Sequence, residues 1–579
     1  MSSARLASRS LAGLLFALSL PLPLAAQASA SAAATGELPL KLAPRPTSAA
    51  ISAADLMTRL YIFADDSMMG RQVGTVYNLK GTAYIESEVR RLGLQPAGDN
   101  GGYFQNIPLY AYTVDSTATS LKVGGKTLAY GTDYLPISRA ERRVSLDGVP
   151  VVYGGSTSDT TTWIPAAAAK GKIVVLSVEP TAQPFRNTFF TVNQRYGGAS
   201  AVLIGALERL PANVRAYFSS FTALKKDDTP AAGAPTVFVV PSVAASLFNN
   251  ASLRTLKPGA AGNAVGGTLV LHETQAPGRN VVAILPGSDP TLRGEYVAIG
   301  AHNDHVGYDT SPVDHDSLRA LDMVARQQGA DNPAPGKLTD AQQARFTALL
   351  DSMRKVHPAR QDSIFNGADD DGSGSVSVLE VAEAFATATQ KPKRSILFVW
   401  HTGEEAGLFG SQHFTDHPTV PRDSIVAQLN MDMVGRGGAN DVTGETKEGG
   451  LTHGGPGYLQ LVGSRRLSTE LGDLIEQVNR DNNLGFTFDY SMDANGHPQN
   501  IYCRSDHYEY ARYGIPIVFF TTGGHADYHQ VTDEPQYIDY NRMASVASLV
   551  YDAAWKVADL DPRVVVDKQK PNPKGACVQ

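Results

Sequence analysis

Five strongly apolar runs alternate with helical patterns in the second half of the chain. They are residues 281–285, 296–299, 395–400, 426–429 and 515–520. A strand that is apolar along its whole length must be covered on both faces, as in a mostly parallel sheet between two layers of helices. We therefore predict an α/β domain over residues 276–560, with a mostly parallel or mixed central sheet flanked by helices.

Imidazole, carboxylate and phenol side chains follow the ends of four of these runs. They are His302, Asp304 and His305 after the second run, His401, Glu404 and Glu405 after the third, Asp432 after the fourth, and Tyr528 and His529 after the fifth. Ligands of open α/β sheets bind at the carboxyl ends of the strands. Because parallel strands present these ends at one edge, we predict that the side chains meet there.

Three consecutive aspartates, residues 369–371, add a negative cluster just before a helical pattern. Charge crowded in this way is costly unless a cation or a set of hydrogen-bond donors compensates it. Taken alone, the segment from Asp369 to Glu380 also fits the spacing of a calcium-binding EF-hand loop. The aspartates therefore predict a cation site but do not identify the cation.

The imidazoles far away in the sequence favour a transition metal. An EF-hand closes its own site within about a dozen residues and needs no distant histidine, whereas imidazole ligands are typical of zinc and similar metals. The imidazoles and carboxylates also outnumber the four ligands of one tetrahedral zinc. We therefore predict two metal ions roughly 3.5–4 Å apart that share a bridging carboxylate, and keep a calcium-binding module as a remote alternative.

The order of five motifs resembles that of a known enzyme family. The motifs are His302-x-Asp304, residues 367–374, residues 403–411, residues 430–435, and Tyr528 followed by His529. They are similar to those of the secreted di-zinc aminopeptidases, in the zinc exopeptidase superfamily that includes glutamate carboxypeptidase and transferrin-receptor-like proteins. The resemblance covers residues 280–560 and implies the phosphorylase/hydrolase-like α/β fold of that superfamily.

The resemblance also implies a role for each matched residue. His302 and Asp432 would bind one Zn²⁺, Glu405 and His529 the other, and Asp370 would bridge them. Glu404 would be the general base, and Tyr528 would donate a hydrogen bond to the oxyanion. Asp304 would orient His302 through the second ring nitrogen, as metal-bound imidazoles usually require.

Other polar residues near the motifs receive more modest interpretations. His507 and Arg504 lie where the family carries substrate-proximal residues, and Arg436 is a further candidate to meet a substrate carboxylate. Because five ligands complete the metal pair, we assign the remaining nearby histidines to packing or polar lining: His305, His401, His413, His417 and His525. We expect Asp369 and Asp371 to shape the turn that carries Asp370.

The first half of the chain is expected to carry no catalytic group. Residues 1–28 read as a secretory signal peptide, with Arg5 and Arg9 before an apolar core and an A-x-A site after it. Residues 29–50 are a predicted linker, and residues 51–129 a helical part that packs on the peptidase domain. Residues 130–275 read as short strands, and their segments 171–176 and 198–204 resemble the protease-associated (PA) domain, an inserted β-rich module.

Three segments depart from a minimal peptidase domain. Residues 309–366 form a mostly helical insertion, in which Thr339 and Gln342 predict a capping box for one helix. Residues 435–457 are Gly/Thr-rich and predict a mobile loop, and residues 561–579 predict a disordered tail. The insertion and the loop leave the sheet at the edge with the motifs, so we expect both to wall the pocket.

Together these features predict an exported aminopeptidase, periplasmic or extracellular, that uses two Zn²⁺ ions to hydrolyse peptides. The formal net charge of −7 and the lack of a basic block argue against a nucleic-acid partner, and no apolar stretch predicts a membrane anchor. The two cysteines, Cys503 and Cys577, are left either paired or free. The alternatives are a carboxypeptidase or dipeptidase of the same superfamily and, more remotely, a receptor-like or calcium-binding protein without activity. A glutaminyl cyclase is less expected because the two-metal set is complete.

Overall fold

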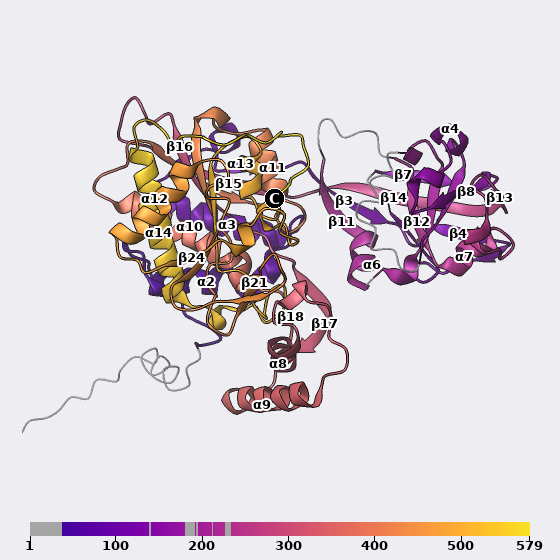
Figure 1. The fold of residues 1–579 in the computed structure, drawn as a ribbon, viewed down its shortest axis with the longest axis horizontal. Coiled ribbons are helices and arrows are strands. Elements are labelled where there is room, and N and C mark those ends of the chain that lie inside the picture. The colour runs from indigo at the N-terminus through magenta and orange to yellow at the C-terminus, as the bar shows by residue number, and fades with distance from the viewer. Residues whose placement is uncertain (1–37, 138–139, 180–191, 193–194, 211, 226–232) are drawn as a thin grey trace, which may run out of the picture.

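The computed structural model describes residues 38–579, except residues 138–139, 180–191, 193–194, 211 and 226–232. Figure 1 shows a large α/β body and a smaller β-rich body, joined by extended strands. The predicted signal peptide and the first part of the predicted linker lie outside the described residues. Among those that are described, no helix is both long and apolar enough to cross a membrane.

The large body is built on one mixed sheet of nine strands. Its order is β1-β15-β19-β16-β20-β25-β23-β24, with β2 also paired to β15. The strands are β1 (Gln95–Pro96), β2 (Phe104–Asn106), β15 (Arg279–Leu285), β16 (Tyr296–His302), β19 (Ser395–His401), β20 (Ile425–Met431), β23 (Tyr458–Val462), β24 (Thr487–Asp489) and β25 (Ile517–Thr521). The four central neighbours β19, β16, β20 and β25 are parallel, whereas β15 and β23 run antiparallel to them. The predicted α/β fold with a mixed sheet is confirmed.

Helices cover both faces of this sheet, as the apolar strands require. Along β19, Phe398 and Trp400 pack on one face, and Leu397 and Val399 pack on the other. The first face is covered by α2 (Ala53–Phe63), α3 (Val76–Arg91), α10 (Gly374–Thr387), α12 (Thr469–Asp481) and α14 (Tyr540–Asp559). The opposite face is covered by α11 (Phe409–Asp416) and α13 (His507–Ala511).

The β-rich body consists of two sheets. The first has the order β13-β8-β9-β10-β12-β6, and the second joins β11, β3, β14, β4 and β5, with β7 also on β14. The bounds are β6 (Tyr134–Ile137), β8 (Val151–Ser156), β9 (Ile173–Ser177), β10 (Ala201–Gly205), β12 (Thr236–Val239) and β13 (Ala261–Gly262), then β3 (Leu109–Val114), β4 (Ser120–Val123), β5 (Lys126–Thr127), β7 (Arg142–Ser145), β11 (Ser220–Leu224) and β14 (Val265–Ala276). Its described residues also form the short helices α4 (Ala166–Ala169), α6 (Ala212–Ser219) and α7 (Pro241–Ser246).

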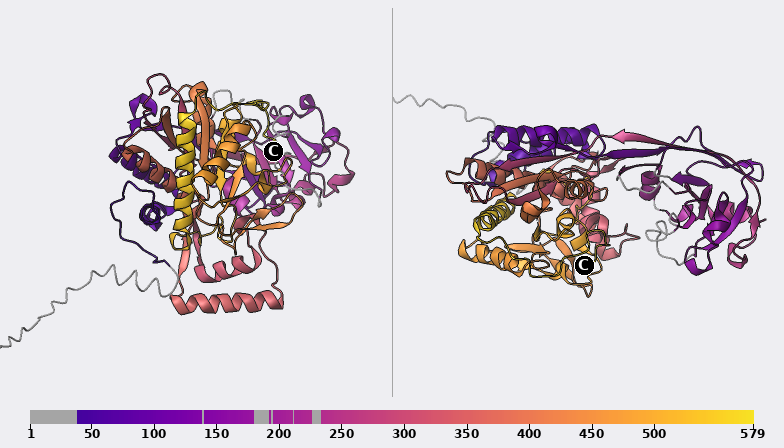
Figure 2. Two further views of the ribbon diagram at one scale, coloured as in Figure 1. Left: turned by 60° about the vertical axis from the view of Figure 1, so that its left-hand side comes forward. Right: turned by 90° about the horizontal axis from the view of Figure 1, so that it is seen from above.

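The boundary predicted between residues 129 and 130 differs from the structure. Strands β3 and β4 lie before it, yet both pair with β14 in the β-rich body. Only the preceding part, through β2, belongs to the large body, where β1 and β2 pair with β15. Figure 2 (right) shows the long strands that run from one body to the other. The β-rich body therefore begins near Leu109.

The insertion between β16 and α10 protrudes from the large body (Figures 1 and 2). Its base is a two-stranded ribbon, β17 (Tyr308–Asp314) with β18 (Gln361–Ile364), and its outer part is α8 (His315–Ala325) with α9 (Asp340–Val356). The predicted capping box of Thr339 and Gln342 begins α9. The segment predicted to be a mobile loop, residues 435–457, instead contains an antiparallel hairpin, β21 (Val442–Glu445) and β22 (Leu451–His453).

The C-terminal tail is held against the large body, and the prediction of a disordered tail is wrong. Cys577 forms a disulfide with Cys503. The Gln579 side chain accepts a hydrogen bond from the Tyr502 backbone N–H (2.9 Å) and donates one to the Met492 carbonyl (2.6 Å). Composition alone could not reveal these contacts, because they depend on residues about 75 positions earlier in the chain.

Loss of this disulfide is expected to destabilise the protein. Cys577→Ser should lower the free energy of unfolding by about 2–4 kcal/mol, because the bond closes a long loop in the unfolded chain. Urea unfolding of the variant and the parent protein measures the difference. Cys503→Ser should lower stability by the same amount, and the double variant by no more than either; an unchanged unfolding midpoint would contradict the prediction.

Candidate metal centre

The strand ends bring the predicted site residues to one edge of the sheet. His302 is the last residue of β16, Glu404 and Glu405 follow the end of β19, and Asp432 follows β20. Tyr528 and His529 lie in the loop after β25. Asp370 comes from the turn Ala368–Ser373, immediately before α10, and its peptide bond to Asp371 is cis. Because the four neighbouring strands β19, β16, β20 and β25 are parallel, the residues that follow them meet at one edge of the sheet although they are far apart in the sequence.

The first group of candidate ligands consists of His302, Asp370 and Asp432. His302 Nε2 lies 3.1 Å from Asp370 Oδ1 and 3.6 Å from Asp432 Oδ1. The side chains of His302 and Asp370 are 1% and 4% exposed. Ser505 Oγ donates a hydrogen bond to the other carboxylate oxygen of Asp432 (2.7 Å), which fixes that side chain.

The second group shares Asp370 through its other oxygen. His529 Nε2 lies 2.9 Å from Asp370 Oδ2 and 3.0 Å from Glu405 Oε2. His305 also belongs to this group, although the sequence analysis assigned it to packing. The structure therefore brings all five predicted ligand residues into two adjacent groups that meet at one carboxylate.

The donor atoms of these groups fit divalent metal ions. Within the part of the chain that the structure describes, Glu405 Oε1 and His529 Nε2 are buried without a hydrogen-bond partner. No arginine or lysine forms an ion pair with Asp370, Glu405 or Asp432 there. The ion-pair partners of these carboxylates in the described part of the chain are imidazoles, and carboxylate together with imidazole is a common ligand set of zinc.

The surroundings push the pKa values of two carboxyl groups apart. Burial raises the pKa of Glu404 well above its ordinary value, and the Asp432 and Glu405 carboxylates raise it further. Burial alone would also raise the pKa of Asp370, but the imidazoles of His302 and His529 beside it outweigh burial and hold the pKa well below its usual range. Glu404 is thus suited to accept a proton, and Asp370 to remain charged.

The neighbours of Asp370 do more than shape its turn. Asp371 accepts hydrogen bonds from the backbone N–H groups of His302 (3.1 Å) and Met433 (3.2 Å), so it fastens the ends of β16 and β20 to the turn. Asp369 accepts from the Gly435 N–H (2.7 Å). The EF-hand alternative does not fit this geometry, because Glu380 pairs with Arg59 (3.0 Å) instead of closing a site with the aspartates.

Asp304 holds the loop with Glu404, and its predicted role requires a correction. Its carboxylate accepts hydrogen bonds from the N–H groups of Gly403 (2.7 Å) and Glu404 (3.2 Å). His302 Nδ1 lies 3.1 Å from the backbone carbonyl of Asp304 but 3.8 Å from its carboxylate. The carbonyl oxygen, and not the side chain, is therefore the hydrogen-bond partner that orients His302.

A pocket lined by His302, Asp370, Asp432 and Glu405 opens onto both groups and onto Glu404. Part of its wall is apolar: Met433, Met492, Ile501 and Phe519. The insertion contributes Gln328 and Asp331, and the β21 hairpin contributes Thr443 and Gly444, so both segments wall the pocket. Arg504 also lines it and donates a long hydrogen bond to the Tyr528 hydroxyl (3.4 Å) while pairing with Asp331 (3.4 Å).

Two residues assigned near the substrate lie elsewhere. The His507 ring stacks on Phe519 with centroids 4.6 Å apart and is not among the residues that line the pocket, and burial lowers its pKa to about 3. His507 is therefore a core residue, and its substrate-proximal assignment is wrong. Arg436 pairs with the buried Asp527 (2.9 Å), so it is not available to a substrate carboxylate.

Of the histidines assigned to packing, His305 is the one that lies among the candidate ligands. By contrast, His401 Nε2 contacts the Tyr510 hydroxyl (2.9 Å) behind the sheet, and His525 Nε2 lies 3.2 Å from Asp369. His413 and His417 stack on each other beside a separate surface pocket. A sequence signal for His305 did exist, because it directly follows Asp304 and lies three residues after the end of β16.

Comparisons with known proteins match the region that carries the site. Residues 280–554 match the model of peptidase family M28. Leucine aminopeptidase 1 of Coccidioides posadasii (strain C735) is 30% identical over 203 residues, which cover 33% of this chain and 47% of that protein. Leupeptin-inactivating enzyme 1 of Streptomyces exfoliatus is 29% identical over 178 residues, or 30% of this chain and 33% of that protein. The chain thus spans less than half the length of these curated relatives.

Among solved structures, the chain is similar to an aminopeptidase from Aneurinibacillus sp. strain AM-1. The alignment covers 90% of this chain and 97% of that one, with 17% identity and a TM-score of 0.48.

Proposed function

We propose, from the match of residues 280–554 to the model of peptidase family M28, that the chain is an exported, zinc-dependent aminopeptidase. It removes N-terminal residues from peptides, with Glu404 as the general base beside two zinc ions. The observation that carries the proposal is that both ligand groups share Asp370 and that Glu404 lines the same pocket.

The chain offers ligands for two ions. His302 and Asp432 would hold one ion, Glu405 and His529 the other, and Asp370 would touch both through different oxygens. When bound, such a pair supplies a Lewis acid for the scissile carbonyl and lowers the pKa of a water molecule toward neutrality.

Glu404 then moves the proton that the reaction requires. Its carboxylate takes a proton from the attacking water and returns it to the nitrogen of the leaving amine, so that it acts first as base and then as acid. The raised pKa of Glu404 favours proton uptake. The hydrogen bond from its own N–H to Asp304 fixes the backbone from which the side chain projects into the pocket.

Tyr528 is proposed to stabilise the oxyanion that forms at the carbonyl oxygen. Burial raises the pKa of Tyr528 well above its ordinary value, so its hydroxyl remains a donor, and Arg504 approaches that hydroxyl from the pocket wall. Such a donor contributes more in the transition state than in the ground state.

Tyr528→Phe is expected to lower kcat by about 10²–10³-fold, the usual cost of losing one oxyanion donor. KM and bound metal should change little, because the ring still stacks on His529. Steady-state kinetics with metal analysis measure both quantities. Tyr513→Phe, which removes a hydroxyl bonded to Asp416 away from the pocket, serves as the matched control. A Tyr528→Phe enzyme with unchanged kcat would refute the assignment.

The pocket wall favours a large apolar side chain at the N-terminal residue of the substrate. Met433, Met492, Ile501 and Phe519 supply apolar surface close to the candidate ligands, and burial of such a side chain contributes about 1.5–3 kcal/mol. The relative in Coccidioides is named a leucine aminopeptidase, which agrees with this preference.

Export and the identity of the β-rich body remain parts of the proposal. The Cys503–Cys577 disulfide supports an oxidising compartment such as the periplasm or the extracellular space. We assign the β-rich body, residues 109–276, to a PA domain that shapes substrate access. Its position beside the large body agrees with that role (Figure 1).

The direct test is an assay of zinc-reconstituted protein on matched substrates. Leucine arylamide and peptides with a free N-terminus should be cleaved, and the same peptides with an acetylated N-terminus should not. Cleavage confined to blocked peptides from their C-terminus would instead establish the carboxypeptidase alternative. Cleavage of dipeptides alone would establish a dipeptidase.

A further inference from the structure

We propose that His305 is a fourth protein ligand of the second zinc ion, the ion held by Asp370, Glu405 and His529. This assignment rests on the proposed two-metal function and adds a residue to the set that the sequence motifs imply. It makes the two metal positions unequal, with three protein ligands at the first and four at the second.

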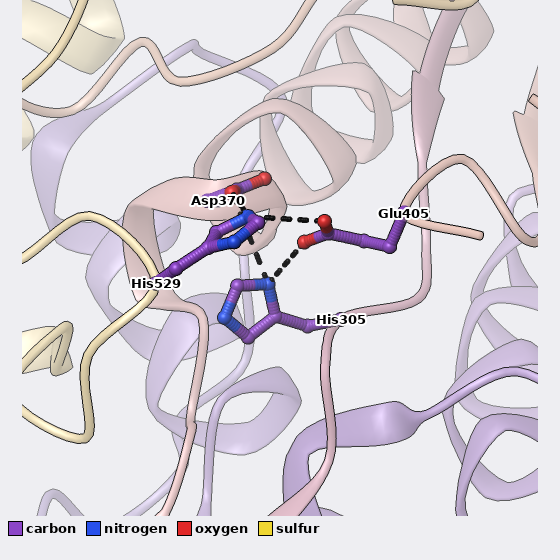
Figure 3. A group of neighbouring side chains, drawn as sticks. All are labelled: His305, Asp370, Glu405 and His529. Atoms are coloured by element: carbon purple, nitrogen blue, oxygen red, sulfur yellow. Dashed lines mark ion pairs between the residues drawn. The ribbon is translucent and has the colours of Figure 1, made fainter. Parts of the chain in front are cut away.

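The geometry of the second group places the His305 ring among the donor atoms. Figure 3 shows His305 facing Glu405 and His529, with Asp370 on the far side of the group. His305 Nδ1 lies 2.7 Å from Glu405 Oε1 and 3.9 Å from Asp370 Oδ2. The four donor atoms all lie within 4.8 Å of one another, as the ligands of one ion must.

The atoms that face each other in this group lack hydrogen bonds. Both ring nitrogens of His305 and Glu405 Oε1 are buried without a hydrogen-bond partner among the described residues. The 2.7 Å contact between Nδ1 and Oε1 is short, but it lacks hydrogen-bond geometry. Buried polar groups are nearly always satisfied, so a nitrogen and a carboxylate oxygen that lie side by side without hydrogen bonds support a cation bound to both, since both are ordinary ligands of zinc.

The ring of His305 is held in this orientation by close packing. Gly367 has φ +55, and a Cβ atom there would lie 2.5 Å from His305 Cγ and 2.3 Å from the Asp370 carbonyl oxygen. Only glycine therefore allows the turn with Asp370 to approach the ring this closely. On another side the ring meets His529 edge to face, with centroids 5.3 Å apart. The imidazole is thus positioned before any metal binds.

The unequal numbers of protein ligands imply different roles for the two metal positions. Four protein ligands complete a tetrahedral zinc, as in structural sites, whereas three protein ligands leave a position open, as in catalytic sites. We therefore assign tight retention of metal to the second position. The open coordination position, where the substrate or water enters, belongs to the first position, beside Glu404.

The experiment combines a count of imidazole ligands with the affinity for zinc. X-ray absorption of the two-zinc protein should show three imidazoles per two ions, from His302, His305 and His529, and His305→Ala should show two. Competition of metal-free protein with a chelator should show a loss in affinity for the tighter ion of more than about 100-fold in His305→Ala. This exceeds the 10–100-fold cost of losing a partner that only orients a ligand.

His401→Gln is the matched control, because it alters a buried histidine that bonds Tyr510 away from the metal groups. It should retain both ions with the affinities of the parent protein. Two imidazoles in the parent protein, or a loss of less than 100-fold in His305→Ala, would overturn the ligand assignment. The imidazole count needs no variant, so a folding defect in His305→Ala does not obscure the result. A parent protein that binds two ions without cleaving peptides contradicts the proposed function and leaves the ligand assignment intact.

Discussion

Glu404→Gln is expected to retain both zinc ions and to lose about 10²–10⁴-fold in kcat, the range that a general base contributes. Glutamine has nearly the same shape as glutamate and keeps the backbone hydrogen bond to Asp304, but its amide does not accept the proton of the attacking water. Glu404 belongs to neither ligand group, so the change should leave the metal positions intact. Metal analysis and steady-state kinetics on the same preparation measure the two effects separately.

The control for this variant is Glu448→Gln, an exposed glutamate in the turn between β21 and β22. It should keep the activity of the parent protein. A Glu404→Gln enzyme within about tenfold of the parent kcat would remove Glu404 from the mechanism. If the variant lost zinc together with activity, Glu404 would belong to the ligands, and another group would have to act as the base.

The sequence was sufficient for the centre of the fold because its signals are local. Each of the five apolar runs became a strand, namely β15, β16, β19, β20 and β25. The direction of a parallel strand determines the edge at which the following residue lies. The strand pattern alone therefore groups His302, Glu405 and Asp432 at one edge of the sheet.

Features that depend on long-range pairing were not predictable in this way. Strands β3 and β4 look like a continuation of the N-terminal part, but their partner β14 lies about 150 residues later. The tail has the composition of a disordered segment, yet Cys503, Tyr502 and Met492 hold it in place. Local composition contains no information about either contact, whereas the Thr339 capping box, which is local, was predicted correctly.

Side-chain direction was the second source of error within the site. His507 and His305 both lie close to the motifs in sequence, and their assignments were the reverse of what the structure shows. The His507 ring packs against Phe519 and does not line the pocket, while the His305 ring lies in the second ligand group. Beyond the end of a strand the two-residue alternation stops, so the pattern no longer determines the face on which a side chain lies.

Asp370→Ala is expected to abolish activity by removing metal from both positions. Asp370 is the only residue common to the two ligand groups among the described residues, so its loss leaves His302 and Asp432 facing one ion, and His305, Glu405 and His529 facing the other. The affinity for each ion should fall by more than about 100-fold, since even the loss of an outer partner costs 10–100-fold. Titration of metal-free protein with zinc measures this loss, and circular dichroism tests whether the variant remains folded.

Asp473→Ala, on the exposed face of α12, should bind both ions as the parent protein does. If Asp370→Ala retained one tightly bound ion, a bridging role for Asp370 would require that ion to be the one at the second position. Three other protein ligands remain there after the substitution. Retention of both ions with unchanged affinity would exclude a shared carboxylate. The two positions would then be independent, and catalysis by a coupled metal pair would no longer explain why Asp370 lies between His302 and His529 at 3.1 and 2.9 Å.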